Sequence, residues 1–557
     1  MRLKYKWIVL ILIVIIAATL RFYRLGKVPT SLNADEAAIG YNAYSILKTG
    51  KDEYNRRFPL LFQSFDDYKL PIYIYFTVPG IAVFGLNDFS VRFPSALFGT
   101  LTVLLTYFLV KELFPKTKNQ ELGTMNHELI PLLSSFLFAI SPWHLQFSRS
   151  AYEANIAVFF IVLGITCLLR APKCKWLFII GFITLALSVW LYHSSRVFVP
   201  LILISYSVLY YRDILKNKLI FLSGIFLCFI ICIPFLLLSL SSTALVRARG
   251  VSALDDETLI KRNVSWRQAD INFHIPYSNM YHNHRFVNIS IIIKGYLEHY
   301  NPNFFVSEIV QGKYHAPGVG LLYLWELPFL LCGIFILLKT KNHEPGTKLL
   351  ILWFFFAPLA ASITHMLPHP VRALIFLPTP QIFVAIGLCG LYNRLYQTKQ
   401  IFRKLFIGIT AIVVLFSCFY YLHQYYIHGP IDYALDWQYG HEQVVEKVTS
   451  LQDKFEKVVV STTLDQPYIF FLYYLRYDPA TYLAFGGTKS GKFDEEGNAF
   501  GKYEFHSYMK SDSVADANTL YVGTPSEILP GTKRLLDIRD PSGNIVYSLY
   551  DKIMYEK

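Results

Sequence analysis

Charged residues are scarce in this chain: Lys, Arg, Asp and Glu together make up 16% of its 557 residues, whereas 54% are hydrophobic and 17% are aromatic. The apolar stretches are too many for one soluble core, which excludes an ordinary soluble domain. The composition therefore predicts a polytopic α-helical membrane protein.

Other features are absent as well. No small-residue cleavage site follows the first apolar run, residues 7–20, so this run is expected to be a retained span. The seven cysteines lie in expected spans or beside basic loops, and no disulfide framework is expected. The chain also lacks an internal repeat and a Gly-rich phosphate loop after a strand.

Eleven apolar runs are expected to cross the bilayer, although several are short for a span. They lie near residues 7–24, 93–112, 129–142, 155–170, 176–191, 197–211, 219–240, 318–338, 349–364, 373–390 and 405–426. Residues 70–86 are also apolar, but counting them as a span would reverse the side of every later basic loop. An interfacial or re-entrant helix, interrupted at Pro79 and Gly80, is expected there.

Basic residues orient these spans. They cluster near residues 170–175, 212–218, 339–348 and 394–404, in alternate connections on the side of the N-terminus. Such loops are cytoplasmic, which places loops 25–92 and 241–317 and the tail from residue 427 outside the cytoplasmic membrane. The net charge of +13 is then explained by loops near lipid headgroups, and no nucleic-acid partner is expected.

The tail has a different character from the rest of the chain. Helix-like segments alternate with strand-like segments at 442–455, 457–462, 466–477, 519–523 and 544–550. This alternation predicts a small external α/β domain over residues 427–557, after a membrane domain over residues 1–426. The polar loop 241–317 is expected to be helical and could cover a site.

An acidic pair, Asp35 and Glu36, follows the first span by about ten residues. One interpretation is structural, with Asp35 as the N-cap of an amphipathic helix that reaches about Leu47. The other is catalytic, because a carboxylate at the membrane face can take a proton from a substrate hydroxyl. The pair alone does not separate the two.

More charged residues are expected at span ends on the same external face. They are Asp66, Asp67, Lys69, Arg149, Glu153, Arg196 and Arg372. Each has an ordinary interpretation: Lys69 and Arg372 can anchor spans at the interface, and Arg149 can pair with Glu153 one helical turn away. As a set, carboxylates and cations on one face suit a cavity that handles phosphate.

Three motifs give a more specific indication: Leu-Asn-Ala-Asp35-Glu36-Ala, Tyr68-Lys69-Leu-Pro and Phe89-Ser-Val-Arg92-Phe-Pro-Ser. In their order and position the chain resembles the GT-C glycosyltransferases of the protein O-mannosyltransferase and aminoarabinose lipid A transferase type, through most of the membrane region. The resemblance implies that Asp35 is the catalytic carboxylate, that Lys69 contacts the lipid phosphate, and that Glu153 is a further carboxylate. The chain departs from the aminoarabinose transferases at Tyr68, where they carry glutamate, and after Glu36, where they carry a basic residue.

The resemblance implies transfer of a sugar from a polyprenyl-phosphate donor to a lipid, glycan or protein acceptor. Asp35 would act as general base with support from Glu36, and direct displacement would invert the anomeric carbon. Lys69, with help from Arg149, Arg196 or Arg372, would neutralise the phosphate, and Asp67 is a further substrate-binding candidate. No metal or other cofactor is expected. The alternatives are a transporter or lipid flippase, which the lack of a pseudo-repeat disfavours, and an accessory protein whose tail binds glycan.

Overall fold

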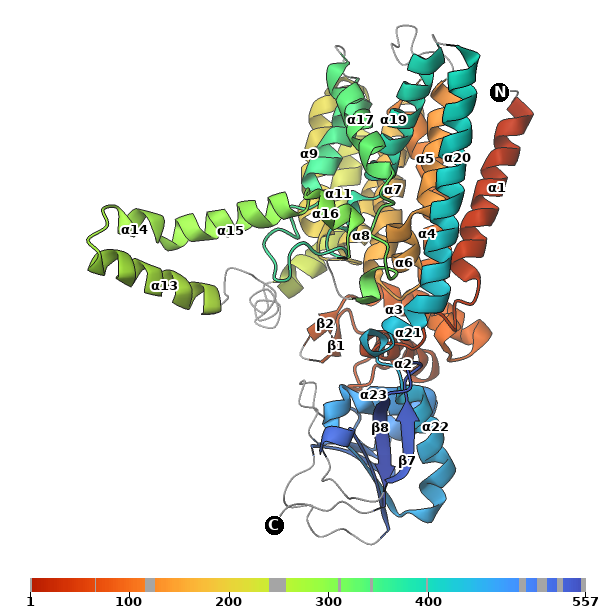
Figure 1. Cartoon of the computed structure of the whole chain (residues 1–557), viewed down its shortest axis with the longest axis vertical. Coiled ribbons are helices and arrows are strands. Elements are labelled where there is room, and N and C mark those ends of the chain that lie inside the picture. Colours follow the sequence, from red (N-terminus) through yellow and green to blue (C-terminus); the bar gives the residue numbers. More distant parts are fainter. Residues whose placement is uncertain are drawn as a thin grey trace.

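The computed structural model describes residues 3–65, 67–115, 126–239, 257–308, 312–340, 344–396, 399–489, 497–507, 518–527 and 534–551. A bundle of long helices occupies one end of the molecule and a sheet occupies the other (Figure 1). The N-terminal helix begins at the end of the bundle far from the sheet, where the basic connection near residues 394–404 also lies (Figure 1). This common end agrees with the charge pattern; which side faces the cytoplasm stays a prediction.

Each of the eleven expected spans contains a helix. These are α1 (Leu3–Phe22), α4 (Asp88–Leu113), α5 (Asn126–Ile140), α7 (Glu153–Arg170), α8 (Leu177–Val189), α9 (Ser195–Leu209), α11 (Lys218–Ser239), α17 (Glu326–Lys339), α18 (Pro345–Phe356), α19 (Thr379–Tyr396) and α20 (Gln400–His423). Six helical stretches of the described chain are long and apolar enough to cross a membrane, or seven if α5 and the bent continuation α6 (Pro142–Ser148) form one span. The multi-pass character is therefore confirmed, while the number of eleven crossings stays a prediction. All seven cysteines are free, as expected.

The expected interfacial segment forms α3 (Pro71–Phe84), a helix of 14 residues. Before α3, the Lys69 ammonium contacts Asp35; after it, the Asp88 carboxylate at the start of α4 accepts a hydrogen bond from Tyr473 of the C-terminal part. Both ends of α3 therefore lie at the same face of the bundle. The predicted interruption at Pro79 is wrong, because the helix continues through it. Close packing at Gly80, where an added Cβ would lie 3.1 Å from the Ser90 carbonyl oxygen of α4, offsets the one lost helix bond.

The C-terminal part is built on a six-stranded sheet with the order β4-β5-β3-β6-β8-β7. The strands are β3 (Lys457–Val460), β4 (Asn498–Phe500), β5 (Tyr503–Phe505), β6 (Thr519–Gly523), β7 (Arg534–Arg539) and β8 (Ile545–Tyr550). β3 runs parallel to β5 and β6, and the remaining pairs are antiparallel. The helices of this part are α22 (His441–Leu451), α23 (Pro467–Tyr474) and α24 (Pro479–Ala484).

The first long loop packs on this C-terminal part through α2 (Ala34–Thr49). A Cβ on Gly40 of α2 would lie 2.5 Å from the ring of Tyr473 in α23, so the close approach requires a glycine. One buried hydrophobic cluster joins residues of α2, α3, α23 and the sheet. Residues before and after position 427 thus share a core.

The described part of loop 241–317 is helical, as expected: α13 (Glu257–Asn272), α14 (Ser278–Tyr281), α15 (His284–Glu298) and α16 (Pro302–Val306). Residues 240–256 and 309–311 lie outside the described chain. Helices α13, α14 and α15 extend sideways from the bundle as an arm (Figure 1). Among the described residues of this loop, the arm lies away from α2 (Figure 1), whereas the turn η2 (Gly312–Tyr314) brings Tyr314 within electrostatic reach of Asp35.

Candidate active site

A pocket lies between α2, the short strand β2 (Asp67–Lys69), the turn before α7 and the residues after α8. Its lining includes Asp35, Glu36, Asp67, Lys69 and Glu153, five of the nine charged residues singled out from the sequence. Four segments that are distant in the chain thus bring these side chains together. Asp66 lies outside the described residues.

The shortest contact between charged groups in the pocket joins Asp35 and Lys69, whose Oδ1 and Nζ atoms lie 2.8 Å apart. The Asp35 side chain is 69% exposed, whereas that of Lys69 is only 10% exposed. The ammonium also donates to the Ser64 hydroxyl at 2.5 Å and lies 4.9 Å from the centre of the Phe65 ring. The cation is thus fixed in the pocket wall, and the carboxylate is open to a substrate.

The start of α2 differs from the prediction. Asn33, not Asp35, is the N-cap: its side chain accepts from the Glu36 N–H at 2.9 Å, and the Glu36 carboxylate accepts from the Asn33 N–H at 3.4 Å. The helix begins at Ala34, which puts Asp35 inside its first turn. Because this capping box is complete without Asp35, the structural interpretation of Asp35 as a cap is wrong.

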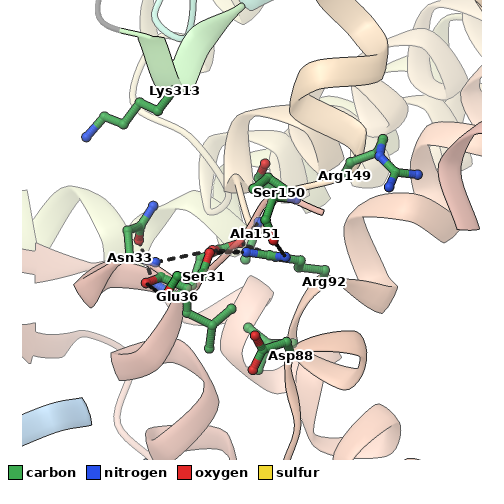
Figure 2. Close-up of polar contacts among 12 residues, drawn as sticks. Ser31, Asn33, Glu36, Asp88, Arg92, Arg149, Ser150, Ala151 and Lys313 are labelled. Atoms are coloured by element: carbon green, nitrogen blue, oxygen red, sulfur yellow. Dashed lines mark hydrogen bonds and ion pairs between the residues drawn. The ribbon is translucent and has the colours of Figure 1, made fainter. Parts of the chain in front are cut away.

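Glu36 is buried, and its carboxylate is occupied by protein groups. Arg92 donates to it through Nε at 3.1 Å and Nη2 at 3.0 Å, and the Ala151 N–H donates at 2.8 Å (Figure 2). Arg92 also donates to the carbonyls of Leu25, Pro29 and Ser31. Glu36 therefore joins α2, α4 and the turn before α7, which is the work of a positioning residue rather than a base.

Arg149 does not reach the pocket. Its guanidinium is buried and donates to the carbonyls of Leu20, Arg21, Tyr23 and Val28 at 2.7–3.0 Å. It also donates to the Tyr425 hydroxyl at 3.1 Å. Since these oxygens occupy its donors, Arg149 fixes the turn after α1, and the predicted help with phosphate has no geometric support.

Arg196 and Arg372 lie beside the pocket rather than in its lining. The Arg196 guanidinium lies 4.1 Å from the centre of the Phe235 ring, and Arg372 donates to the His365 carbonyl at 2.7 Å. Arg372 still acts electrostatically on the neighbourhood of Asp35. Burial raises the pKa of Tyr314 to about 12, the charge of Arg372 opposes this rise, and that of Asp35 adds to it.

Several groups around the pocket were given no role from the sequence. His193 lies in the same external segment as the predicted Arg196 and lines the pocket. Burial raises the pKa of Asp465; the charge of Asp35 raises it further, and that of Lys313 lowers it. Asp465 accepts from the Gln438 side chain at 2.7 Å, and Gln438 in turn accepts from the N–H of Ala34, the first residue of α2, at 2.6 Å. These residues come from distant parts of the chain, so only His193 had a local signal.

Within the described ranges, no three His, Cys, Asp or Glu side chains form a group that could hold a metal ion. The pocket supplies positive charge through Lys69. Lys313, whose side chain is drawn in Figure 2, lies within electrostatic reach of Asp465. Independence from metal stays a prediction.

Sequence comparison places a known family within the membrane region. Residues 69–238 match the dolichyl-phosphate-mannose-protein mannosyltransferase family. The chain is 28% identical over 170 residues to YycA and 27% identical over 187 residues to YkcB, two candidate mannosyltransferases of Bacillus subtilis (strain 168). These matches cover 29% and 31% of this chain but only 22% and 23% of the two relatives.

The solved structures similar to this chain cover much more of it. The crystal structure of ArnT from Cupriavidus metallidurans in the apo state aligns with a TM-score of 0.54 at 14% identity, over 98% of both chains. The oligosaccharyltransferase AglB from Archaeoglobus fulgidus aligns with a TM-score of 0.51 at 15% identity, over 84% of this chain and 63% of AglB. Motifs, family match and architecture agree, and the chain is built on the fold of the GT-C membrane glycosyltransferases.

Proposed function

We propose that this protein transfers a sugar from a polyprenyl-phosphate donor to an acceptor hydroxyl at the external face of the cytoplasmic membrane. The observation that carries the proposal is the pocket in which the exposed Asp35 carboxylate and the Lys69 ammonium lie 2.8 Å apart. A base and a fixed cation in one pocket are what displacement of a sugar phosphate needs. ArnT bound to undecaprenyl phosphate and AglB in complex with a dolichol-phosphate, two structures of the same fold, support a lipid-linked donor.

In this reaction Asp35 removes the proton of the acceptor hydroxyl while the acceptor oxygen attacks the anomeric carbon. The bond between that carbon and the phosphate oxygen breaks, and the lipid phosphate leaves with the electron pair. Lys69 stabilises the charge that develops on the phosphate. A single displacement inverts the anomeric configuration, and the scheme uses no metal.

The surroundings of Lys69 suit a lipid phosphate. Leu70 follows it in the pocket lining, and Pro71 begins the apolar helix α3. Near the other end of α3, Val83 is 74% exposed and Phe84 is 45% exposed, as expected for a helix in contact with lipid. A cation that precedes such a helix can hold the phosphate while the prenyl chain stays in the bilayer.

Glu36 supports this chemistry without entering it. Through Arg92 and Ala151 it holds the first turn of α2 against α4 and the turn that leads to Glu153. Asp35 and Glu153 therefore face the same space. Glu153 and Asp67 line the same pocket and are the further carboxylates proposed to contact the sugar or the acceptor.

The test is a transfer assay with the full-length protein in liposomes, in which polyprenyl-phosphate mannose is the donor probe and cell-envelope extract supplies acceptors. Asp35→Asn keeps the size of the side chain but removes its basicity, so turnover should fall roughly a hundred- to ten-thousandfold. Asp453→Asn, an exposed site in the C-terminal part, serves as the matched control and should keep full turnover.

A fall of less than about fivefold in Asp35→Asn would remove Asp35 as the base, since loss of a positioned base costs far more. In that case Glu153→Gln and Asp67→Asn identify which other pocket carboxylate serves. A transporter would move its lipid substrate equally well in all three variants.

A further inference from the structure

The arm formed by α13, α14 and α15 carries a large exposed apolar surface. On α15, Phe286, Ile289, Ile293 and Leu297 are 53–58% exposed and recur at helical spacing, so they form one row, named here the α15 stripe. The side chain of Trp266 on α13 is also 53% exposed. Contiguous apolar surface of this kind marks an interaction site rather than a face in water.

Contacts with the bundle show which way the α15 stripe faces. Tyr296 follows Ile293 by three residues and so lies in the row beside the stripe. Its hydroxyl donates to the Phe355 carbonyl, at the end of the membrane helix α18, at 3.1 Å. Gly295, on the opposite side of α15, meets the Ser362 carbonyl beyond that helix, 2.4 Å from where its Cβ would be. The stripe therefore lies toward the membrane helices and away from the loop that follows α18.

The arm leaves the bundle sideways, roughly across the long axis of the molecule (Figure 1). If the bundle spans the membrane along that axis, an arm at the end of α18 lies in the plane of the membrane surface. This is the orientation in which an amphipathic helix binds a bilayer.

Charge on the arm favours anionic lipid. The arm, residues 257–298, carries five Lys and Arg residues against three acidic residues, Glu257, Asp270 and Glu298. Asp270 is already paired with His282, whose Nε2 lies 2.9 Å from its carboxylate. Basic residues close to an anionic membrane surface strengthen binding by electrostatic attraction.

We propose that the arm lies on the membrane surface, with the α15 stripe inserted among lipid acyl chains and its basic residues on anionic headgroups. The chain continues from α15 through α16 to the turn that carries Lys313. The proposal does not depend on the glycosyl-transfer chemistry.

Photoreactive phosphatidylglycerol tests this on the unmodified full-length chain in nanodiscs, with a diazirine in its acyl chain and labelled peptides mapped by mass spectrometry. The peptides that contain the α15 stripe should be labelled, and labelling should fall severalfold when the probe is photoreactive phosphatidylcholine in nanodiscs without anionic lipid. Equal labelling by the two probes would overturn the role of the basic residues. Absence of label from the stripe would overturn insertion.

A pair of variants separates the stripe from the rest of the helix. Ile289→Asn with Ile293→Asn should lose most of the label on α15, whereas Ile291→Asn with Ile292→Asn, the same change off the stripe, should keep it. Equal loss in both pairs would contradict a membrane-facing stripe. The unmodified chain is also labelled in detergent-lipid micelles at increasing protein concentration. If the label on the α15 stripe is then lost, a second copy of the chain covers the stripe, and the proposal is overturned.

Discussion

The ammonium group of Lys69 contacts the Asp35 carboxylate and the Ser64 hydroxyl. A donor phosphate that enters the pocket competes with Asp35 for this cation. Binding of the donor is therefore expected to loosen the ion pair and to free the carboxylate for the acceptor proton. In the proposed reaction, Asp35 would thus become available as base only when the donor phosphate, the leaving group, is bound.

Lys69→Met keeps the length of the side chain but removes the charge-assisted contact, which is worth about 1.5–3 kcal/mol. Binding of undecaprenyl phosphate, used as the probe, should weaken by roughly ten- to a hundredfold in a titration of the purified protein. Lys51→Met is the control, because the Lys51 ammonium contacts the Asn55 side chain and does not line the pocket. Unchanged affinity in Lys69→Met would return Lys69 to the role of an interface anchor.

The charged residues differ in how far the sequence could place them. Asp35 and Lys69 sit in short motifs beside expected spans, and Glu153 opens a span, so their common pocket follows from topology. Arg149 has the same local setting, but its carbonyl partners at Leu20 and Val28 lie more than a hundred positions away. A guanidinium donates hydrogen bonds to whichever oxygens the folded chain places around it. A single sequence does not show which oxygens these are.

Among the elements, α3 determines the side of the membrane on which each later loop lies, because one more crossing would reverse them all. Its 14 residues extend about 21 Å, less than the roughly 30 Å of a bilayer core. An alkaline phosphatase fused after residue 120 should therefore be inactive, and one fused after residue 440 should be active. Green fluorescent protein at the same two positions should give the reverse pattern. Phosphatase activity at residue 120 would mean that α3 crosses the membrane.

Long apolar runs were the most predictable elements, because burial in lipid requires both length and low polarity, and every expected span contains a helix. Short elements were not predictable. Strands β4 and β5 have three residues each; β4 pairs with β5, and the place of β5 beside β3 depends on pairing with a segment far away in the chain. The start of α2 shifted for a local reason, since Asn33 and Glu36 complete the cap between them.

At the scale of the whole molecule, Glu53 links the first loop to the C-terminal part. This buried carboxylate accepts from the Asn42 side chain and from the Thr488 hydroxyl, each at 2.7 Å, and from the Tyr468 hydroxyl at 3.3 Å. Burial raises its pKa from the ordinary 4.5 to about 7, against the opposing effect of these hydrogen bonds. Near neutral pH, the connection between the two parts therefore contains a carboxyl that is partly protonated.

A raised carboxyl pKa means that the folded state holds the proton more tightly than the unfolded state does. Stability should then be fully present below the ordinary pKa of 4.5 and should decline as pH rises toward about 7. Glu53→Gln should remove this decline, which amounts to about 3 kcal/mol at most. Thermal unfolding in detergent across this pH range checks the prediction, with the exposed Glu456→Gln as control. A Glu53→Gln protein whose stability still declined as steeply as that of the control would show that another group titrates.

The hydrogen bond from the Ala34 N–H to the Gln438 side chain joins positions 404 residues apart. More than three quarters of the chain must therefore be synthesised before the Ala34 N–H can form its hydrogen bond with the Gln438 side chain. Until then, a nascent chain already threaded into the membrane carries Asp35 on a helix whose first N–H lacks this acceptor. The hydrogen bonds that hold the first turn of α2, and with it Asp35, are therefore complete only after the late-made segment has docked.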